Sequence, residues 1–144
     1  MEIEIKNLKI FGDDKGYLFE GLRADDKLFN GEFGQCLISV LYPGVIKGLH
    51  KHSKQIDYTC CIKGNLKYVL VKEGENGIET KIITLGEKNP ILIKTTPGLW
   101  HGYMALDKEA IVLHVMNKPY KINEDDTKRL DPYHFGDLWS KKDN

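Results

Sequence analysis

The sequence contains no long hydrophobic segment. No stretch of its 144 residues is apolar for long enough to cross a bilayer, and the first ten residues, MEIEIKNLKI, do not resemble a signal peptide. The expected location is therefore the cytoplasm, with no membrane partner. A chain of this length is expected to form one domain, residues 1–144, around a single hydrophobic core.

The sequence also lacks net charge and an even set of cysteines. Lys and Arg together number 21, as do Asp and Glu, which argues against a large basic surface for nucleic acid. The three cysteines are Cys36, Cys60 and Cys61. Neighbouring residues on a strand point to opposite faces, so Cys60 and Cys61 are poor disulfide partners. We expect three reduced thiols, at least one of them in the core.

No long segment shows a helical period. Apolar residues instead alternate with period two, as in strands, and turns such as LYPG, EGENG and TTPG separate them at short intervals. Many short strands divided by such turns favour an all-β sandwich or closed barrel. The polar end, residues 123–144, is expected to be an irregular tail with a short helix at most. The alternating segments are Ile3/Ile5, Cys36/Ile38/Val40, Leu66/Tyr68/Leu70, Ile78/Thr80/Ile82 and Val112/His114/Met116.

Histidines and a carboxylate gather in the segment GLHKHSKQIDYTCCIKG. His50 and His52 are two residues apart, so they share one face of a strand, and a hairpin can fold Asp57 back beside them. His101 follows a Pro-Gly turn at the start of a later strand. These four side chains form a suitable site for one divalent transition metal. The same histidines could instead be hydrogen-bonded inside a barrel without a metal.

The spacing of these residues resembles the signatures of the cupin superfamily. The pattern G-x5-H-x-H-x4-D-x6-G, from Gly44 to Gly64, matches the first signature, with Asp57 in place of the usual Glu. The segment PGLWH, which ends at His101, resembles the second signature. This resemblance implies an all-β cupin jelly-roll barrel. Many cupins bind Fe, Mn, Ni or Zn through these positions, and many bind no metal.

Longer motifs resemble one cupin branch, the dTDP-4-dehydrorhamnose 3,5-epimerases and related nucleotide-sugar epimerases. The likeness runs from about Phe11 to about Trp139. FGDDKGYLFE resembles that family's F-x-D-x-R-G-x-F-x-E motif, GVIKGLH its G-V-L-R-G-L-H motif, and DPYHFGDLW its D-P-x-I-x-x-x-W stretch. The segment LGEKNPILIKTTPGLWHGYMAL resembles a fourth motif, which ends in H-G-F. Gln35 and Ser39 fall where the family has a Gln and a Ser.

The resemblance implies an isomerase that epimerises C3, C5 or both carbons of a dTDP-4-keto-6-deoxy sugar, without a cofactor. Such an enzyme removes a proton next to the 4-keto group and returns one to the opposite face of the ring. By resemblance His50 is the base and His101 a second active-site histidine. Substrate-holding positions are matched by Lys15, Glu20, Gln35 and Lys47, with Arg23 as a weaker candidate for phosphate contact and Tyr120 for stacking.

Two positions depart from the family pattern. Asp57 aligns with the family's active-site lysine, and His114 aligns with its acid-side tyrosine. His114 could donate a proton as a neutral ring, or could be a hydrogen-bonded core histidine. Asp57 could orient one of the histidines or accompany a metal. In the family an Asp near the C-terminus orients the base, and Asp137 and Asp143 are both candidates for that role.

Two other functions remain open from the sequence. The first is a metal-dependent cupin, an oxygenase or isomerase, that uses His50, His52, Asp57 and His101 as ligands. The second is a non-catalytic cupin that binds sugar nucleotides. In each case the partner is a small molecule, and an exposed N-terminal strand such as EIEIK favours pairing into a homodimer.

Overall fold

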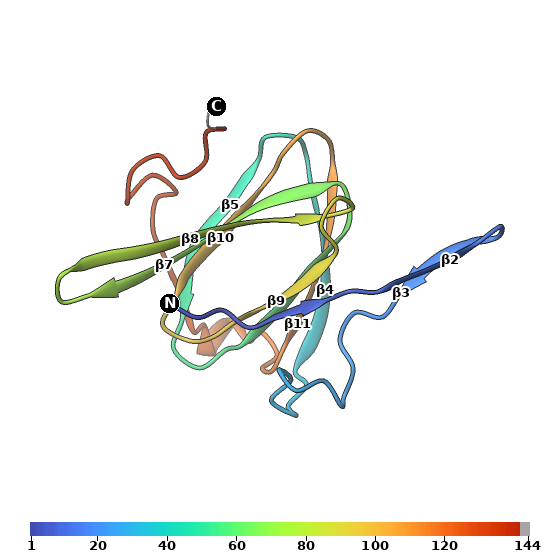
Figure 1. The fold of residues 1–144 in the computed structure, drawn as a ribbon. Coiled ribbons are helices and arrows are strands. Elements are labelled where there is room, and N and C mark those ends of the chain that lie inside the picture. Colours follow the sequence, from blue (N-terminus) through green and yellow to red (C-terminus); the bar gives the residue numbers. More distant parts are fainter. Residues whose placement is uncertain (142–144) are drawn as a thin grey trace.

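The computed structural model describes residues 1–141, and these residues fold as an all-β barrel (Figure 1). No helix within the described residues has the length and apolar character needed to span a membrane. The strands are β1 (Ile5–Asn7), β2 (Ile10–Asp13), β3 (Gly16–Phe19), β4 (Gln35–Leu41), β5 (Ile46–His52), β6 (Asp57–Lys63), β7 (Asn65–Gly74), β8 (Gly77–Gly86), β9 (Ile91–Thr95), β10 (Trp100–Ala105), β11 (Ala110–Met116) and β12 (Thr127–Arg129), with a 3₁₀ turn, η1 (Ile122–Glu124), before the last strand.

Two five-stranded antiparallel sheets form the walls of the barrel. One sheet has the order β1-β9-β6-β11-β4 and the other has the order β12-β5-β10-β7-β8. Strands distant in sequence are therefore neighbours, as in a jelly roll, and the predicted fold class is confirmed. The five alternating segments predicted from the sequence lie in β1, β4, β7, β8 and β11, although Ile3 itself precedes β1.

The core explains the alternation of these segments. Buried side chains from both sheets, including Leu66 on β7 and Val112 on β11, meet in the largest apolar cluster. Cys61 joins this cluster, whereas Cys60 belongs to a second cluster on the opposite face of β6. The expected placement of these two cysteines is confirmed. Burial raises the pKa of the Cys60 thiol to about 11 and that of Cys61 to about 12, so both remain thiols at neutral pH.

The connection between β5 and β6 differs from the prediction. The sequence suggested a hairpin, but β5 and β6 belong to different sheets and do not pair with each other. The residues between His52 and Asp57 cross from one wall of the barrel to the other. His52 and Asp57 still approach each other because both side chains point into the interior.

Two predictions about the chain ends need correction. The tail is not wholly irregular, because β12 pairs with β5 and places Arg129 opposite His50. One edge of the N-terminal strand β1 pairs with β9. Only its other edge is open to pairing with a second copy. The β2–β3 hairpin pairs only with itself and projects away from the barrel (Figure 1).

Close approach of two strands explains a pair of glycines near the histidines. Gly48 on β5 has φ of +142°, and a Cβ added there would lie 2.8 Å from the Cα of Gly102 on β10. A Cβ added at Gly102 would lie 2.7 Å from the carbonyl oxygen of Lys47. The two glycines therefore allow the backbones carrying His50 and His101 to lie against each other.

Candidate active site

A cavity of about 260 Å³ lies between the two sheets and contains most of the residues singled out from the sequence. Each sheet supplies one wall, because alternate residues of each strand point inward. The β12-β5-β10-β7-β8 sheet contributes Lys47, His50, His52, Tyr68, His101, Tyr103, Thr127 and Arg129, and the other sheet contributes Gln35, Ser39, Asp57 and His114.

The structure separates the predicted substrate residues into two groups. Gln35, Lys47 and Tyr120 line the cavity together with the predicted histidines. The other three do not line it. Lys15 is exposed in the turn of the β2–β3 hairpin, and the Arg23 guanidinium lies 3.1 Å from Glu20 and 2.8 Å from Asp25 in exposed ion pairs. For Lys15, Glu20 or Arg23 to contact a substrate in the cavity, the residue would have to come from a second copy of the chain.

His50 lies on β5 and points into the cavity half-buried. Its backbone is opposite His101 in the β5–β10 ladder, and the two ring centroids are 6.3 Å apart. Burial, together with the nearby His101 and Arg129, lowers the pKa of His50 to about 4. Within residues 1–141 the His50 ring makes no hydrogen bond. The ring is thus neutral at pH 7, with a lone pair available to accept a proton.

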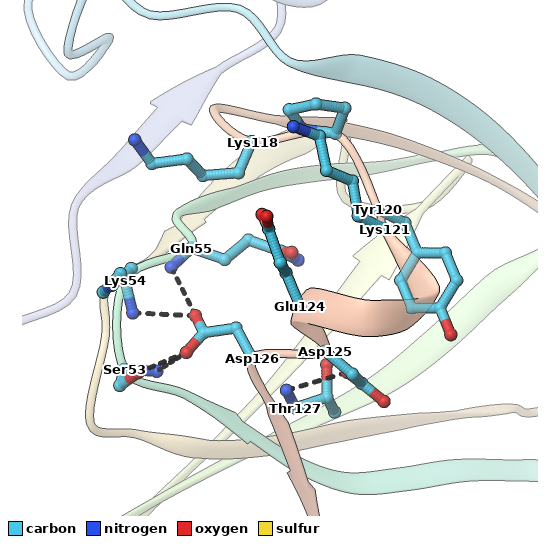
Figure 2. A pocket seen from close by; sticks show the side chains of 11 residues that line it. Ser53, Lys54, Gln55, Lys118, Tyr120, Lys121, Glu124, Asp125, Asp126 and Thr127 are labelled. Atoms are coloured by element: carbon cyan, nitrogen blue, oxygen red, sulfur yellow. Dashed lines mark hydrogen bonds between the residues drawn. The ribbon is translucent and has the colours of Figure 1, made fainter.

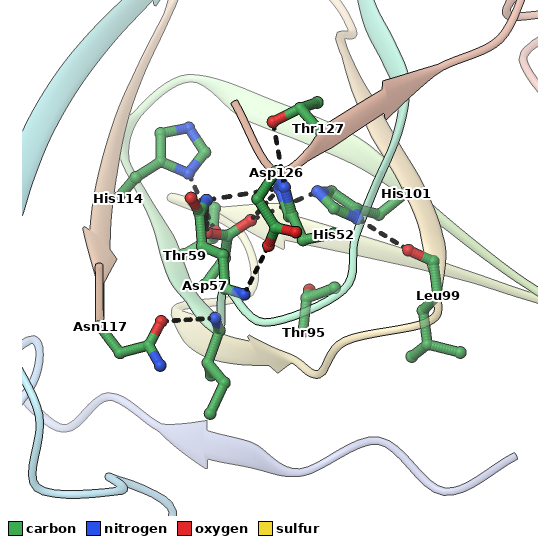
Figure 3. A network of polar contacts seen from close by, with 12 residues as sticks. His52, Asp57, Thr59, Thr95, Leu99, His101, His114, Asn117, Asp126 and Thr127 are labelled. Atoms are coloured by element: carbon green, nitrogen blue, oxygen red, sulfur yellow. Dashed lines mark hydrogen bonds and ion pairs between the residues drawn. The ribbon is translucent and has the colours of Figure 1, made fainter. Parts of the chain in front are cut away.

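Asp57 is buried and lies between two imidazoles. Its Oδ2 atom is 3.3 Å from Nε2 of His101 and 3.4 Å from Nε2 of His52. The Gln55 amide donates a hydrogen bond of 2.7 Å to Oδ1 of the same carboxylate (Figure 3). Burial alone would raise the pKa of Asp57, but the hydrogen bonds from His101 and His52 outweigh it and hold the pKa well below its usual value.

Acceptors face both nitrogens of the His101 ring. Nδ1 is 3.1 Å from the carbonyl oxygen of Leu99, which can only accept, and Nε2 faces the ionised Asp57. A hydrogen atom on Nδ1 satisfies the Leu99 carbonyl, and either a hydrogen atom or a metal ion at Nε2 would satisfy Asp57. The ligand atoms of His52, Asp57 and His101 lie within 4.8 Å of one another, which fits a metal site. His50, the fourth predicted ligand, is not part of this compact group.

Oxygen atoms beyond these ligands orient the two rings. Thr127 Oγ1 lies 3.1 Å from Nδ1 of His52, and the Leu99 carbonyl oxygen fixes His101 in the same way. Such contacts on Nδ1 direct Nε2 toward the interior in metal-binding and in metal-free sites alike. These contacts hold the two rings in place. They are equally compatible with a proton and with a metal ion at Nε2.

The loop between β5 and β6 is held by one carboxylate. Asp126 accepts hydrogen bonds from the backbone N–H groups of Ser53, Lys54 and Gln55 and from the Ser53 hydroxyl (Figure 2). The same loop carries the Gln55 side chain that contacts Asp57. Although burial opposes it, the hydrogen bonding lowers the pKa of Asp126 to about 2, so the carboxylate stays charged at neutral pH.

His114 lies on β11, in the opposite wall from His50, and both of its nitrogens are engaged. Nδ1 is 3.0 Å from Thr59 Oγ1 (Figure 3), and Nε2 is 2.9 Å from the Tyr103 hydroxyl. Burial lowers the pKa of His114 to about 4, so the ring is neutral at pH 7. The Tyr103 hydroxyl therefore stands at the Nε2 side of His114, within the same cavity.

The two candidates for an orienting Asp can be placed only in part. Asp137 is exposed, and its carboxylate accepts hydrogen bonds from the backbone N–H groups of Trp139 and Ser140 and from the Ser140 hydroxyl. It caps its own turn, so the suggestion that it orients His50 is not supported. Asp143 lies outside the described residues.

Sequence reasoning missed five side chains of this cavity. Thr127 and Arg129 lie on the short β12 strand, which carries no apolar alternation that would reveal it. Gln55 lies in a loop, and Tyr68 and Tyr103 lie at strand positions that are equally suited to core aromatics. The one available signal was Tyr103, which follows directly on the His-Gly pair. The five residues are Gln55, Tyr68, Tyr103, Thr127 and Arg129.

A second, outer groove of about 500 Å³ borders the cavity (Figure 2). It shares Gln55, Tyr120 and Thr127 with the cavity, and Lys54, Lys118 and Lys121 are among its other lining residues. We place the chemistry in the smaller cavity, because the buried histidines and Asp57 converge only there. A bound molecule too long for the cavity would extend into this groove.

Taken together, the jelly roll and its histidine-lined interior define a cupin-like barrel with a cavity between its two sheets. Residues 2–144 match the family model of dTDP-4-dehydrorhamnose 3,5-epimerase. The chain belongs to this family of isomerases, and the predicted family is confirmed.

Individual relatives agree with this assignment. The chain is 33% identical over 132 residues to the spore coat polysaccharide biosynthesis protein SpsL of Bacillus subtilis, an alignment covering 89% of this chain and 87% of that protein. The fold is similar to a dTDP sugar isomerase from Desulfovibrio desulfuricans G20, with a TM-score of 0.85, 22% identity, and coverage of 96% and 89% of the two chains. It is also similar to ChmJ, a 3'-monoepimerase from Streptomyces bikiniensis in complex with dTDP-quinovose, with a TM-score of 0.82, 17% identity, and coverage of 95% and 74%.

Proposed function

We propose that this protein epimerises a dTDP-4-keto-6-deoxy sugar at C3, C5 or both carbons, with His50 as the base. The observation that carries the proposal is the position of His50, a neutral imidazole directed into the cavity between the sheets with no hydrogen-bond partner among residues 1–141. A ring in this state can accept a proton from carbon. The family match and the dTDP-sugar ligand of ChmJ support the choice of substrate class.

Cations on the cavity wall suit two negatively charged groups, the ketone oxygen as it gains charge during the reaction and the diphosphate of the substrate. Lys47 and Arg129 both line the cavity, and Arg129 is opposite His50 in the β12–β5 ladder. Removing a proton next to a ketone places negative charge on the ketone oxygen, and fixed positive charges nearby stabilise it. The same cations suit the diphosphate of the substrate. No cofactor is needed for this chemistry, and its absence stays a prediction.

The test is solvent deuterium uptake by dTDP-4-keto-6-deoxyglucose in D₂O. We expect exchange at C3 or C5 with the natural protein and its loss, by about 10²–10⁴-fold, in His50→Asn. His134→Gln is the matched control, because His134 is exposed and lies outside the cavity. Exchange no faster than the enzyme-free rate would refute the proposed activity, and full activity in His50→Asn would remove the proposed base.

We also propose that the active form is a homodimer. Large apolar side chains are exposed on the projecting hairpin and on the edge strand β4, among them Leu18 at 60%, Ile38 at 56% and Val40 at 51%. Pairing of two copies would cover them and give Lys15 and Glu20 a route to the cavity of the other copy. Sedimentation equilibrium at micromolar concentration tests this, and a monomer with full activity would contradict it.

A metal-dependent cupin is the second candidate, favoured by the compact group of His52, Asp57 and His101. A metal held there would supply a Lewis acid to a substrate oxygen. Elemental analysis of protein purified without chelator distinguishes the two candidates. Stoichiometric metal, with stabilisation on adding the ion, would favour this candidate, and less than about a tenth of an equivalent with no stabilisation would count against it.

A further inference from the structure

The rings that line the cavity follow one another from one wall to the other. The centroid of His50 is 6.3 Å from that of His101, His101 is 6.5 Å from Tyr68, and Tyr68 is 6.1 Å from Tyr103. Tyr103 is in turn 5.4 Å from His114 on the opposite sheet. His50 and His114 therefore stand on opposite walls of the cavity, with the Tyr103 ring next to His114.

Tyr103 comes from the same sheet as His50, but its hydroxyl lies 2.9 Å from Nε2 of His114 on the opposite wall. His101 is opposite His50 in the β5–β10 ladder, and Tyr103 follows His101 by two residues on the same face. Two residues of strand correspond to about 7 Å along the strand direction. A ring bound between these positions would present one face to the His50 imidazole and another to the Tyr103 hydroxyl.

His114 is not free to act on a substrate directly. Its Nδ1 is held by Thr59 Oγ1 at 3.0 Å and its Nε2 by the Tyr103 hydroxyl at 2.9 Å. A proton moving from Nε2 toward the cavity would pass through the Tyr103 oxygen. Of the two possibilities that the sequence left open for His114, a direct proton donor or a hydrogen-bonded histidine, this arrangement favours the second.

The neighbours of Tyr103 can stabilise the phenolate that remains after it gives up its proton. His114 with its proton on Nε2 donates to the Tyr103 oxygen, while the Thr59 hydroxyl donates to Nδ1. On the other side, Ser39 receives a 2.7 Å hydrogen bond from the Lys47 ammonium. Burial raises the pKa of the Tyr103 phenol to about 12, and Ser39 acts in the opposite direction. Burial thus keeps Tyr103 protonated until it acts, and the polar neighbours favour the phenolate that remains afterwards.

We propose that Tyr103 is the acid that protonates the substrate carbon on the face opposite His50, with His114 as the positioning residue behind it. This inference rests on the proposed epimerase function. In the step, the Tyr103 O–H bond breaks and a C–H bond forms at the enolate carbon. The negative charge passes from the enolate to the phenolate, while His50 keeps the proton that it took from the other face. In the family pattern the phenol stands at the position of His114, and the H-G-F motif has Phe at the position of Tyr103. In this chain the phenol is at position 103 and the imidazole is at position 114.

The experiment separates proton removal from inversion. With dTDP-4-keto-6-deoxyglucose in D₂O, deuterium incorporation reports on His50, and the stereochemistry of the product, read by NMR, reports on the acid. In Tyr103→Phe we expect inversion to fall by about 10²–10⁴-fold while exchange stays within about threefold of the natural protein. Tyr133→Phe, an exposed tyrosine outside the cavity, should change neither rate.

His114 is tested through the same two rates. His114→Gln is expected to slow inversion and leave exchange intact, and combining it with Tyr103→Phe should add no further loss, because the two residues act in series. The double variant Tyr103→Phe/His114→Tyr returns the phenol to the family position and should recover part of the inversion rate.

The failure modes differ for the two proposals. Absence of exchange in the natural protein would refute the epimerase function. Exchange with inversion intact in Tyr103→Phe, or loss of inversion in Tyr68→Phe instead, would overturn the assignment of Tyr103. Loss of exchange together with inversion in Tyr103→Phe, while dTDP binding and the circular dichroism spectrum stay unchanged, would also overturn it. If Tyr103→Phe does not fold, the His114→Gln result decides by the same criterion.

Discussion

The Oδ2 atom of Asp57 lies 3.3 Å from Nε2 of His101, at the position where the family pattern has a lysine in place of Asp57. A buried negative charge is thus held by the His101 and His52 imidazoles. A lysine, which the family pattern has at this position, would bring a positive charge to these two imidazoles, whereas Asp57 brings a negative one.

Removing the Asp57 carboxylate should destabilise the protein strongly. In Asp57→Asn, the two imidazoles lose their anionic partner inside a buried site, and breaking such a pair typically costs about 3–5 kcal/mol. Urea unfolding measures the change in the free energy of unfolding. Asp25→Asn, which breaks an exposed ion pair with Arg23, should leave it unchanged. Equal effects of the two substitutions would show that the Asp57 contact contributes nothing to stability.

Removing Asp126 should loosen the loop that joins β5 to β6. Asp126→Ala deprives the backbone N–H groups of residues 53–55 of their acceptor. We expect faster amide hydrogen exchange in that loop, a loss of about 1 kcal/mol in stability, and a lower turnover rate because Gln55 no longer fixes Asp57. Asp131→Ala removes a cap from a distant turn and serves as the control. Unchanged exchange at residues 53–55 would contradict the proposed role.

Burial of His114 should make the protein acid-sensitive. Its pKa is about 4 in the folded protein, against an ordinary value near 6.5, so only the unfolded chain binds this proton between those pH values. The contribution is complete above about pH 6.5 and decreases as the pH falls toward 4. We expect His114 to contribute a loss of about 1–2 kcal/mol between pH 7 and pH 5, measured by urea unfolding, in addition to the loss from His50, whose pKa is also lowered to about 4.

Two variants isolate this effect. His114→Gln should reduce the pH dependence by that amount, whereas His134→Gln, at an exposed site, should retain it. A pH dependence that is the same in His114→Gln as in the natural protein would show that His114 is not the group responsible.

Adding one methyl group between β5 and β10 should disturb the histidine pair. In Gly102→Ala, the new Cβ would lie 2.7 Å from the Lys47 carbonyl oxygen and 3.1 Å from the Gly48 Cα, so the strands must separate. We expect a loss of about 1–3 kcal/mol and a fall in activity. Gly74→Ala, whose nearest contact would be 3.6 Å, is the matched control. Similar stability and activity in the two variants would contradict the close-approach argument.

Much of this architecture could be read from the sequence, because period-two alternation and the spacing of the histidines are local features. His50, His101 and Asp57 were placed correctly in one cavity on that basis. Pairing between strands is not local, so the crossing of the chain from β5 to β6 was mistaken for a hairpin. The same limit hid Arg129, since a three-residue polar strand is recognised only by the strand it joins.

The remaining differences arise from side-chain partners. The sequence left His114 as either a proton donor or a hydrogen-bonded core histidine, and only the structure shows that Tyr103 and Thr59 occupy its two nitrogens. Tyr103 could not be distinguished from a core aromatic, because its hydroxyl partner comes from another sheet. Lys15 and Glu20 matched a family motif and Arg23 was a weaker candidate, yet none of the three lines the cavity.

The short link between His52 and Asp57 ties the two walls together at the site. With only four residues between them, these walls have little freedom to part there. We therefore expect a substrate to enter the cavity elsewhere. Tyr120, which lines both the cavity and the outer groove, borders that route.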